Sequence, residues 1–219
     1  MFEIPGFSLP ISFPDRRESK RRITLALLDQ DGDIAKELLA GWSHATDAAY
    51  SPASRCARAL LRHMLEREIE TSRQRAISRD ASGRPVLEAR AGEILPIISI
   101  SHAGRFIAAA YGFVARLGLD LESSAKTRDL QGIAELAFGP AERRQVEQHG
   151  PDAFYRIWTG REALAKATGR AFAQVMDRRD YISEALSEGV AQLYLDGEAW
   201  SLAHARPLEH LFLAVAWQD

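Results

Sequence analysis

The chain has 219 residues, of which 46% are apolar and 26% are charged, so it can bury a sizeable hydrophobic core. A formal net charge of −2 gives no overall basic field of the kind that nucleic-acid binding needs. Proline and charged residues interrupt the apolar runs of the N-terminal segment, so we expect no secretion signal, no membrane span and a cytoplasmic location. Cys56 is the only cysteine, which excludes an internal disulfide and a cysteine-rich zinc site.

The first half of the chain is expected to contain one helix and three short strands. The helix is predicted over Pro52–Ile69, and the strands over Arg84–Glu88, Ile97–Ser101 and Arg105–Phe113. Repeated strands joined by glycine-containing turns favour an antiparallel sheet.

The second half opens on a strand around Asp120 and closes on a three-stranded meander. Helices are predicted over Asp129–Phe138, Ala141–Gln148 and Asp152–Thr168, and the meander strands over Val190–Leu195, Ala199–Ala205 and Leu211–Trp217. The Asp-Gly pair at 196–197 is typical of a tight hairpin turn. Helices combined with antiparallel sheets, without regular βαβ alternation, predict the α+β class.

Three pairs of similar segments recur along the chain at a constant offset of 106 residues. The pairs begin at Phe106 and Phe212, at Gly83 and Gly189, and at Ser54 and Gly160. A shared offset favours an ancient duplication, with two helix-plus-strands halves in pseudo-twofold relation. Chance similarity between generic amphipathic segments is the alternative. We expect halves at 1–115 and 116–219 that behave as one functional unit.

Acidic residues form the strongest candidate site. Asp120 and Glu122 lie on one face of the predicted strand, where two like charges are unfavourable unless they are solvated, protonated or bridged by a cation. Trp158, Glu162 and Lys166 follow a helical spacing of four residues and share one helix face. With Glu162 as a third ligand, Mg²⁺ becomes a candidate. The alternative is an ordinary surface ion pair between Glu162 and Lys166.

A second candidate cluster follows the apolar run at Ile97. Ser99, Ser101 and His102 come at the end of this strand, where a hydroxyl and an imidazole can reach a phosphate without being buried. A strand-end histidine that hydrogen-bonds to the backbone is the alternative interpretation.

Arginines supply two further candidate anion sites. Arg84 lies between a glycine and a proline in a turn that could present it to an anion. Arg55, Arg58 and Arg62 share a predicted helix and either clamp a phosphate or form a solvated face.

Four motifs occur in the order "GRP", "SISHAG", "GLDLE" and "FYRIWTGREALAKATG". In this order they resemble the motif series of the Sfp-type 4'-phosphopantetheinyl transferases. The resemblance implies a pseudodimer of two similar α+β halves with the active site between them. It also implies transfer of the phosphopantetheine arm of coenzyme A to a serine of an apo acyl, peptidyl or aryl carrier protein, with release of adenosine 3',5'-bisphosphate.

The resemblance also assigns roles to individual residues. Asp120, Glu122 and Glu162 would hold Mg²⁺, or Mn²⁺, against the coenzyme A pyrophosphate. Glu142 matches an acid proposed to deprotonate the carrier serine, and Lys166 joins it in the catalytic set. Contacts to coenzyme A are implied for Arg55, Arg84, Ser101, His102, Arg161 and Lys166.

Two positions depart from the commonest family pattern, because Arg84 and Arg161 stand where lysine is frequent. Arginine keeps the charge but changes its reach and geometry.

The expected enzyme is a holo-[acyl-carrier-protein] synthase type of transferase that acts as a monomer, with no nucleic-acid partner. The alternatives are a Mg²⁺-dependent coenzyme A or nucleotide pyrophosphatase and a non-catalytic module that binds carrier domains.

Overall fold

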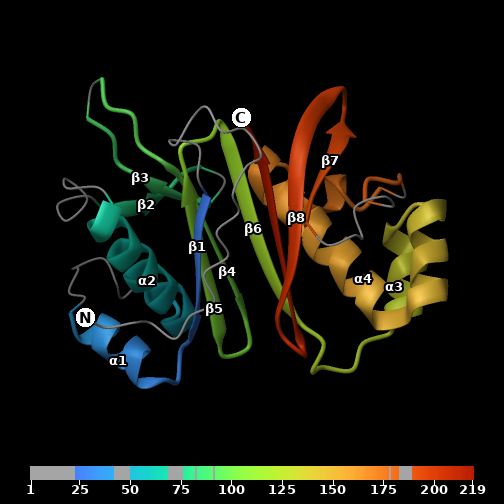
Figure 1. The fold of residues 1–219 in the computed structure, drawn as a ribbon, viewed down its shortest axis with the longest axis horizontal. Coiled ribbons are helices and arrows are strands. Elements are labelled where there is room, and N and C mark those ends of the chain that lie inside the picture. Colours follow the sequence, from blue (N-terminus) through green and yellow to red (C-terminus); the bar gives the residue numbers. More distant parts are fainter. Residues whose placement is uncertain are drawn as a thin grey trace. The chain divides into compact units, whose positions relative to one another are not determined.

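The computed structural model describes residues 23–41, 50–68, 76–81, 83–90, 92–177, 179–182 and 189–219. The chain divides into two compact units, Met1–Val114 and Ala115–Asp219 (Figure 1). Each unit combines helices with antiparallel strands, which confirms the predicted α+β class with one helix-plus-sheet assembly in each half. Among the described helices, none is both long and apolar enough to cross a lipid bilayer.

The first unit is built around a three-stranded antiparallel sheet in the order β1-β5-β4. Its elements are β1 (Ile23–Asp29), α1 (Asp33–Ala40), α2 (Pro52–Glu68), β2 (Ile77–Arg79), β3 (Pro85–Leu87), β4 (Ile97–Ala103) and β5 (Phe106–Gly112). Helix α2 packs on β4 and β5, and its leucines join a core with Ile107 and Tyr111. Strands β2 and β3 form a separate hairpin. The predicted end of the helix at Ile69 lies outside the described residues.

The second unit carries a four-stranded antiparallel sheet in the order β6-β9-β8-β7. Its elements are β6 (Arg116–Ser123), α3 (Leu130–Ala137), α4 (Pro140–Thr168), the 3-10 turn η3 (Phe172–Gln174), β7 (Gly189–Leu195), β8 (Glu198–Leu208) and β9 (Leu211–Gln218). Asp196 and Gly197 both have positive φ angles, 51° and 84°, as the turn of a two-residue hairpin requires. The two helices predicted on either side of Gly150 are joined as α4, with a kink where the φ angle of Gly150 is 63°.

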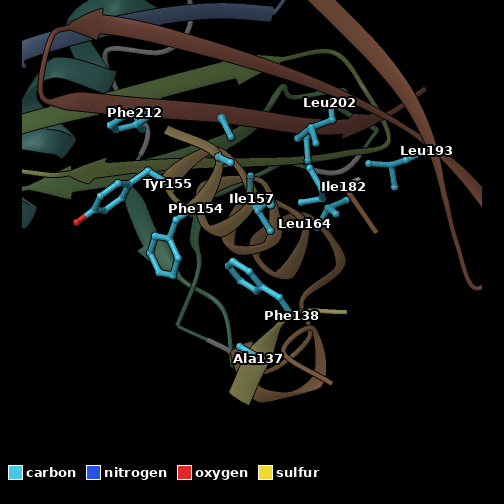
Figure 2. Close-up of a cluster of buried hydrophobic side chains, with 14 of the residues drawn as sticks. Ala137, Phe138, Phe154, Tyr155, Ile157, Leu164, Ile182, Leu193, Leu202 and Phe212 are labelled. Atoms are coloured by element: carbon cyan, nitrogen blue, oxygen red, sulfur yellow. The ribbon is translucent and has the colours of Figure 1, made fainter. Parts of the chain in front are cut away.

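Aromatic side chains fix the orientation of α4 on its sheet (Figure 2). The rings of Tyr155 and Phe212 are stacked with centroids 5.1 Å apart, which ties α4 to β9. The ring centroid of Phe154 lies 5.4 Å from that of Phe138, which follows α3, and 5.7 Å from that of the half-buried Trp158. Contacts of this kind stabilise a core beyond simple area burial. They also set which side chains of α4 face β6.

The two units share one order of elements along the chain. In each, the first strand pairs antiparallel with the last, and the last pairs with the strand before it. Phe106 and Phe212 lie at the start of the corresponding strands β5 and β9. Gly83 lies two residues before β3 and Gly189 begins β7, and the two strands differ in pairing, because β3 pairs with β2 whereas β7 pairs with β8.

Candidate functional site

Close approach of β6 to α4 creates the candidate site in the second unit. A Cβ atom at Gly118 would overlap the backbone of Ala163 and Ala167 on α4, so only glycine allows this spacing. Side chains alternate along a strand, and Asp120 and Glu122 therefore share the α4 side of β6 with Gly118. The face of β6 that carries both carboxylates is thus the face directed at α4.

Lys166 links the C-terminal part of α4 to β6. Its Nζ atom donates to Oδ1 of Asp120 at 2.7 Å and to the carbonyl oxygen of Leu119 at 3.1 Å. The Asp120 side chain is only 3% exposed, whereas that of Lys166 is 33% exposed. A buried carboxylate is therefore neutralised by an ammonium group that still reaches solvent.

Glu162 lies next to this ion pair, one helical turn before Lys166. Burial, followed by the negative charge of Asp120, raises the pKa of Glu162 to about 8. Lys166 opposes this rise, while Glu122 and a hydrogen bond with Asp120 add to it. Burial first, and then the two neighbouring carboxylates, therefore favour the protonated form of Glu162.

Arg128 contacts the third carboxylate of the group. Its Nη2 atom donates to Glu122 at 3.0 Å, and its guanidinium carbon lies 6.0 Å from the centre of the Tyr155 ring. Both members of this ion pair are partly exposed, with 30% and 19% of their side chains accessible. Glu122 is thus paired with a cation that remains partly exposed to solvent.

The donor atoms fit a hard divalent cation in their chemistry. Carboxylate oxygens are the ligands that Mg²⁺ prefers, and a bound cation would favour the ionised form of Glu162, which burial and Asp120 disfavour. Within the described ranges, no three acidic, histidine or cysteine side chains converge closely enough to hold a metal ion. Asp120 is directed at Lys166 and Glu122 at Arg128, so the carboxylates are brought together as neighbours but not as a preformed cage.

Glu142 and Arg161 form a buried ion pair inside the second unit. Both side chains are 0% exposed. The carboxylate of Glu142 accepts hydrogen bonds from Arg161 and from the backbone N–H groups of Gly139, Tyr181 and Ile182. The guanidinium of Arg161 also donates to two backbone carbonyls, those of Val175 and Arg179. This pair joins the start of α4, its C-terminal half, Val175 and residues 179–182.

Burial changes the interpretation of these two residues. A general base has to reach the proton that it abstracts, and Glu142 is enclosed with its oxygens already occupied. Arg161 cannot contact coenzyme A without breaking its hydrogen bonds to Glu142 and to the backbone carbonyls of Val175 and Arg179. The structure therefore argues against the base role of Glu142 and the coenzyme A role of Arg161, and favours a structural role beside Glu162.

The remaining predicted residues belong to the first unit. Arg55 lies half-buried near the start of α2, and His102 is exposed close to the half-buried Ser101 at the end of β4. Arg84 is exposed in the turn before β3, where its Nε and backbone N–H both donate to Asp80 at 3.0 Å. Asp80 thus fixes the turn that presents Arg84.

Arg58 does not belong to a solvated helix face. It is 1% exposed, donates to Ser54 one turn earlier on α2, and stacks 3.8 Å from the centre of the Tyr50 ring. A guanidinium loses little hydration when it stacks on an aromatic ring, which makes this burial tolerable. The interpretation of α2 as a row of solvated arginines is therefore wrong at Arg58.

Comparison with known proteins identifies the segment that carries the acidic site. Residues 116–216 match the family model of the 4'-phosphopantetheinyl transferase superfamily. The match covers nearly the whole of the second unit. The resemblance indicated by the sequence motifs is thereby confirmed. Asp120, Glu122, Glu162, Lys166 and the newly found Arg128 all lie within the transferase-superfamily segment.

Individual 4'-phosphopantetheinyl transferases are similar to a larger part of the chain. The HetI transferase of Nostoc sp. is 30% identical over 141 residues, which cover 63% of this chain and 58% of HetI. The AcpT transferases of Salmonella typhimurium and Escherichia coli K12 are each 29% identical, over 116 and 127 residues. These matches cover 51% and 55% of this chain and 58% and 63% of the two relatives. The chain thus spans about three fifths of the length of the transferases it matches.

Two contributors to the transferase-superfamily segment were not predicted from the sequence. Arg128 follows β6 in a loop, and nothing in its spacing from Glu122 indicates contact. Asp180 accepts hydrogen bonds from the backbone N–H groups of Ala141 and Glu142 at 2.9 Å and so caps α4 from 38 residues away. No local signal marks Asp180 as the cap of α4, because it lies 38 residues beyond the backbone N–H of Glu142 that it binds.

Proposed function

We propose that this protein transfers 4'-phosphopantetheine from coenzyme A to a serine of an apo acyl, peptidyl or aryl carrier protein, in a Mg²⁺-dependent reaction. One observation carries the proposal: Asp120, Glu122 and Glu162 are neighbours beside Lys166 within the segment that matches the transferase superfamily. Their chemistry suits a substrate whose reacting part is a pyrophosphate.

The acidic residues would hold the metal ion, and Lys166 would contact substrate directly. Asp120, Glu122 and Glu162 offer oxygen ligands to Mg²⁺, which when bound neutralises charge on the pyrophosphate. The ammonium group of Lys166 lies at the edge of the site, one-third exposed and held by Asp120. It can offer its charge to phosphate oxygens as negative charge develops on the leaving group.

The proposed reaction exchanges one phosphorus–oxygen bond for another. The carrier serine oxygen attacks the phosphorus that bears pantetheine, and the bond from this phosphorus to the bridging oxygen of the pyrophosphate breaks. Adenosine 3',5'-bisphosphate keeps the bridging oxygen and its electron pair, and the serine proton is lost to a base. The buried Glu142 is not placed to be that base, so we assign it, with Arg161, to holding the part of α4 that carries Glu162.

Residues of the first unit would supply further contacts to coenzyme A. The proposal gives Arg55, Arg84, Ser101 and His102 to its phosphate groups. Each of these side chains is at least partly exposed, and each carries an N–H or O–H donor of the kind that binds phosphate. The hydrogen bonds from Arg84 to Asp80 hold one of these donors in a defined turn.

The proposal includes a cytoplasmic, monomeric enzyme that acts on soluble carriers and tolerates Mn²⁺ in place of Mg²⁺. Carrier helices are usually acidic, and Arg143 and Arg144 on α4 are basic residues that can complement them. Transfer to an acyl carrier would make the enzyme a holo-[acyl-carrier-protein] synthase type.

The test is incubation with coenzyme A, Mg²⁺ and a panel of apo carrier domains, followed by intact mass measurement of each carrier. We expect one added phosphopantetheine on at least one carrier, lost with a chelator and with Glu162→Ala. Glu135→Ala removes an exposed acid of α3 and is the matched control, with transfer retained. Metal-dependent cleavage of coenzyme A with no gain on any carrier would instead identify the pyrophosphatase. Absence of both reactions would favour the non-catalytic module.

A further inference from the structure

Arg128 is a cation beside the candidate metal site, and it has no role in the sequence analysis or in the proposed function. It lies in the loop between β6 and α3. Within the described residues its side chain makes one hydrogen bond, from Nη2 to Glu122 at 3.0 Å. A guanidinium has five N–H groups, so most of its donor capacity is left for another acceptor.

The ring of Tyr155 gives Arg128 a fixed support. The guanidinium carbon lies 6.0 Å from the ring centre, and Tyr155 is itself buried and stacked on Phe212. Because the support does not depend on Glu122, the guanidinium can change its acceptor while keeping its contact with the ring.

A cation on Glu122 changes the electrostatics of Arg128. The ion pair between these residues is partly exposed and therefore weak, whereas a divalent cation can share oxygens of Asp120 and Glu162 as well, in exchange for the Lys166 contact and the Glu162 proton. The metal ion would repel the positive guanidinium at short range. Arg128 then gains by turning to an anion on the substrate, and its forked donors suit a phosphate group.

We propose that Arg128 covers Glu122 in the metal-free protein and passes to an anionic phosphate group of coenzyme A when a divalent cation takes Glu122. The inference rests on the proposed function. It makes Arg128 a substrate-binding residue that couples two binding events. Metal ion and coenzyme A each bind more tightly when the other is present, and by linkage the factor is the same in both directions.

The experiment measures Mn²⁺ binding to the full chain by titration, with free Mn²⁺ followed by electron paramagnetic resonance, in the absence and presence of coenzyme A. The variants are Arg128→Ala, Arg128→Lys and Lys126→Ala, of which the last removes an exposed positive charge from the same loop without touching Glu122. Without coenzyme A, we expect Arg128→Ala to bind Mn²⁺ about three- to five-fold more tightly than Lys126→Ala, because Glu122 is uncovered.

Coenzyme A should reverse the order of the Mn²⁺ affinities of these variants. We expect it to raise the Mn²⁺ affinity of the wild type and of Lys126→Ala by about ten-fold, to raise that of Arg128→Ala far less, and to give Arg128→Lys an intermediate value. A residue that merely stabilised the loop would leave this coupling factor unchanged.

The outcomes separate the inference from the proposed function. Equal Mn²⁺ affinities and equal coupling in Arg128→Ala and Lys126→Ala would overturn the role of Arg128 while leaving the metal site intact. A wild type that binds no Mn²⁺, or a Glu162→Ala variant that binds it as tightly as the wild type, would overturn the proposed metal site and the inference with it.

Discussion

Glu142→Gln tests whether this acid is a structural residue or a catalytic base. The substitution keeps the shape of the side chain but removes the charge that neutralises Arg161 in a fully buried site. It also brings an amide N–H₂ group against the backbone N–H donors of Gly139, Tyr181 and Ile182. The buried guanidinium of Arg161 then has no counter-charge, and the new amide N–H₂ group faces backbone N–H groups with no acceptor between them.

The expected loss of stability follows from this geometry. Removing one partner of a buried ion pair costs about 3–5 kcal/mol, against a total unfolding free energy of about 5–15 kcal/mol for a typical domain. For a chain of this size, that loss lowers the melting temperature by about 10 °C. Urea unfolding followed by circular dichroism measures the change. The matched control is Glu147→Gln, an exposed acid on the same helix, for which we expect a change within about 0.5 kcal/mol.

A double variant shows whether the effect belongs to the pair. Glu142→Gln combined with Arg161→Met should lose less stability than the sum of the two single variants, by at least about 1 kcal/mol, because the uncompensated cation is gone. The reasoning would be refuted by a Glu142→Gln variant of wild-type stability that has lost carrier modification by more than about 100-fold, since general base catalysis contributes on that order. That result would return Glu142 to the role of base.

Three further changes test other parts of the structure. Gly118→Ala places a Cβ against the backbone of Ala163, so we expect a loss of about 1–3 kcal/mol or more in urea unfolding, whereas Gly41→Ala, which meets neighbouring atoms only at 3.8 Å, should be tolerated. Lys166→Met should lower kcat/KM for coenzyme A on the order of 100-fold in the carrier assay, because a cation beside the phosphates is lost; an unchanged value would exclude Lys166 from the site. Burial, reinforced by the charge of Arg156, lowers the pKa of His204 from 6.5 to about 3. Its neutral form is therefore the stabilising one, and this contribution is present above pH 6.5 and lost as pH falls towards 3. Between pH 7 and pH 5 the wild type should lose up to about 2 kcal/mol more than His204→Leu, and equal losses would contradict the burial of an unpartnered imidazole.

Local signals in the sequence were sufficient for much of the second unit. The Asp-Gly turn at 196–197 and the helical spacing of Glu162 and Lys166 both act between neighbours in the chain, so short-range physics predicts them. The period of two along β6 likewise placed Asp120 and Glu122 on one face.

Contacts between distant residues escaped the same reasoning. Lys166 pairs with Asp120 across 46 positions, and Arg161 with Glu142 across 19, so both depend on how α4 packs. The resemblance assigned Arg161 to coenzyme A, and no local signal indicated its burial, because arginine is rarely fully buried. Tertiary packing brings the backbone carbonyls of Val175 and Arg179 to the guanidinium and so supplies the acceptors that make its burial possible.

Elements with weak local patterns were also missed. Strand β1 and helix α1 were not predicted, although β1 forms the complete ladder with β5 that completes the first sheet. Its leucines and isoleucine are equally common in buried helices, so the assignment as a strand comes from pairing with β5. Secondary structure of this kind is decided by tertiary partners and not by the segment itself.

The most direct test of the central claim is the stoichiometry of the two products in one reaction. Coenzyme A and Mg²⁺ are incubated with the protein and a carrier, phosphopantetheine on the carrier is counted by intact mass, and adenosine 3',5'-bisphosphate is quantified by chromatography. The account predicts one carrier-bound phosphopantetheine for each bisphosphate released, and no release when the carrier serine is replaced by alanine. Release of the bisphosphate without a carrier, or with the alanine carrier, would contradict it.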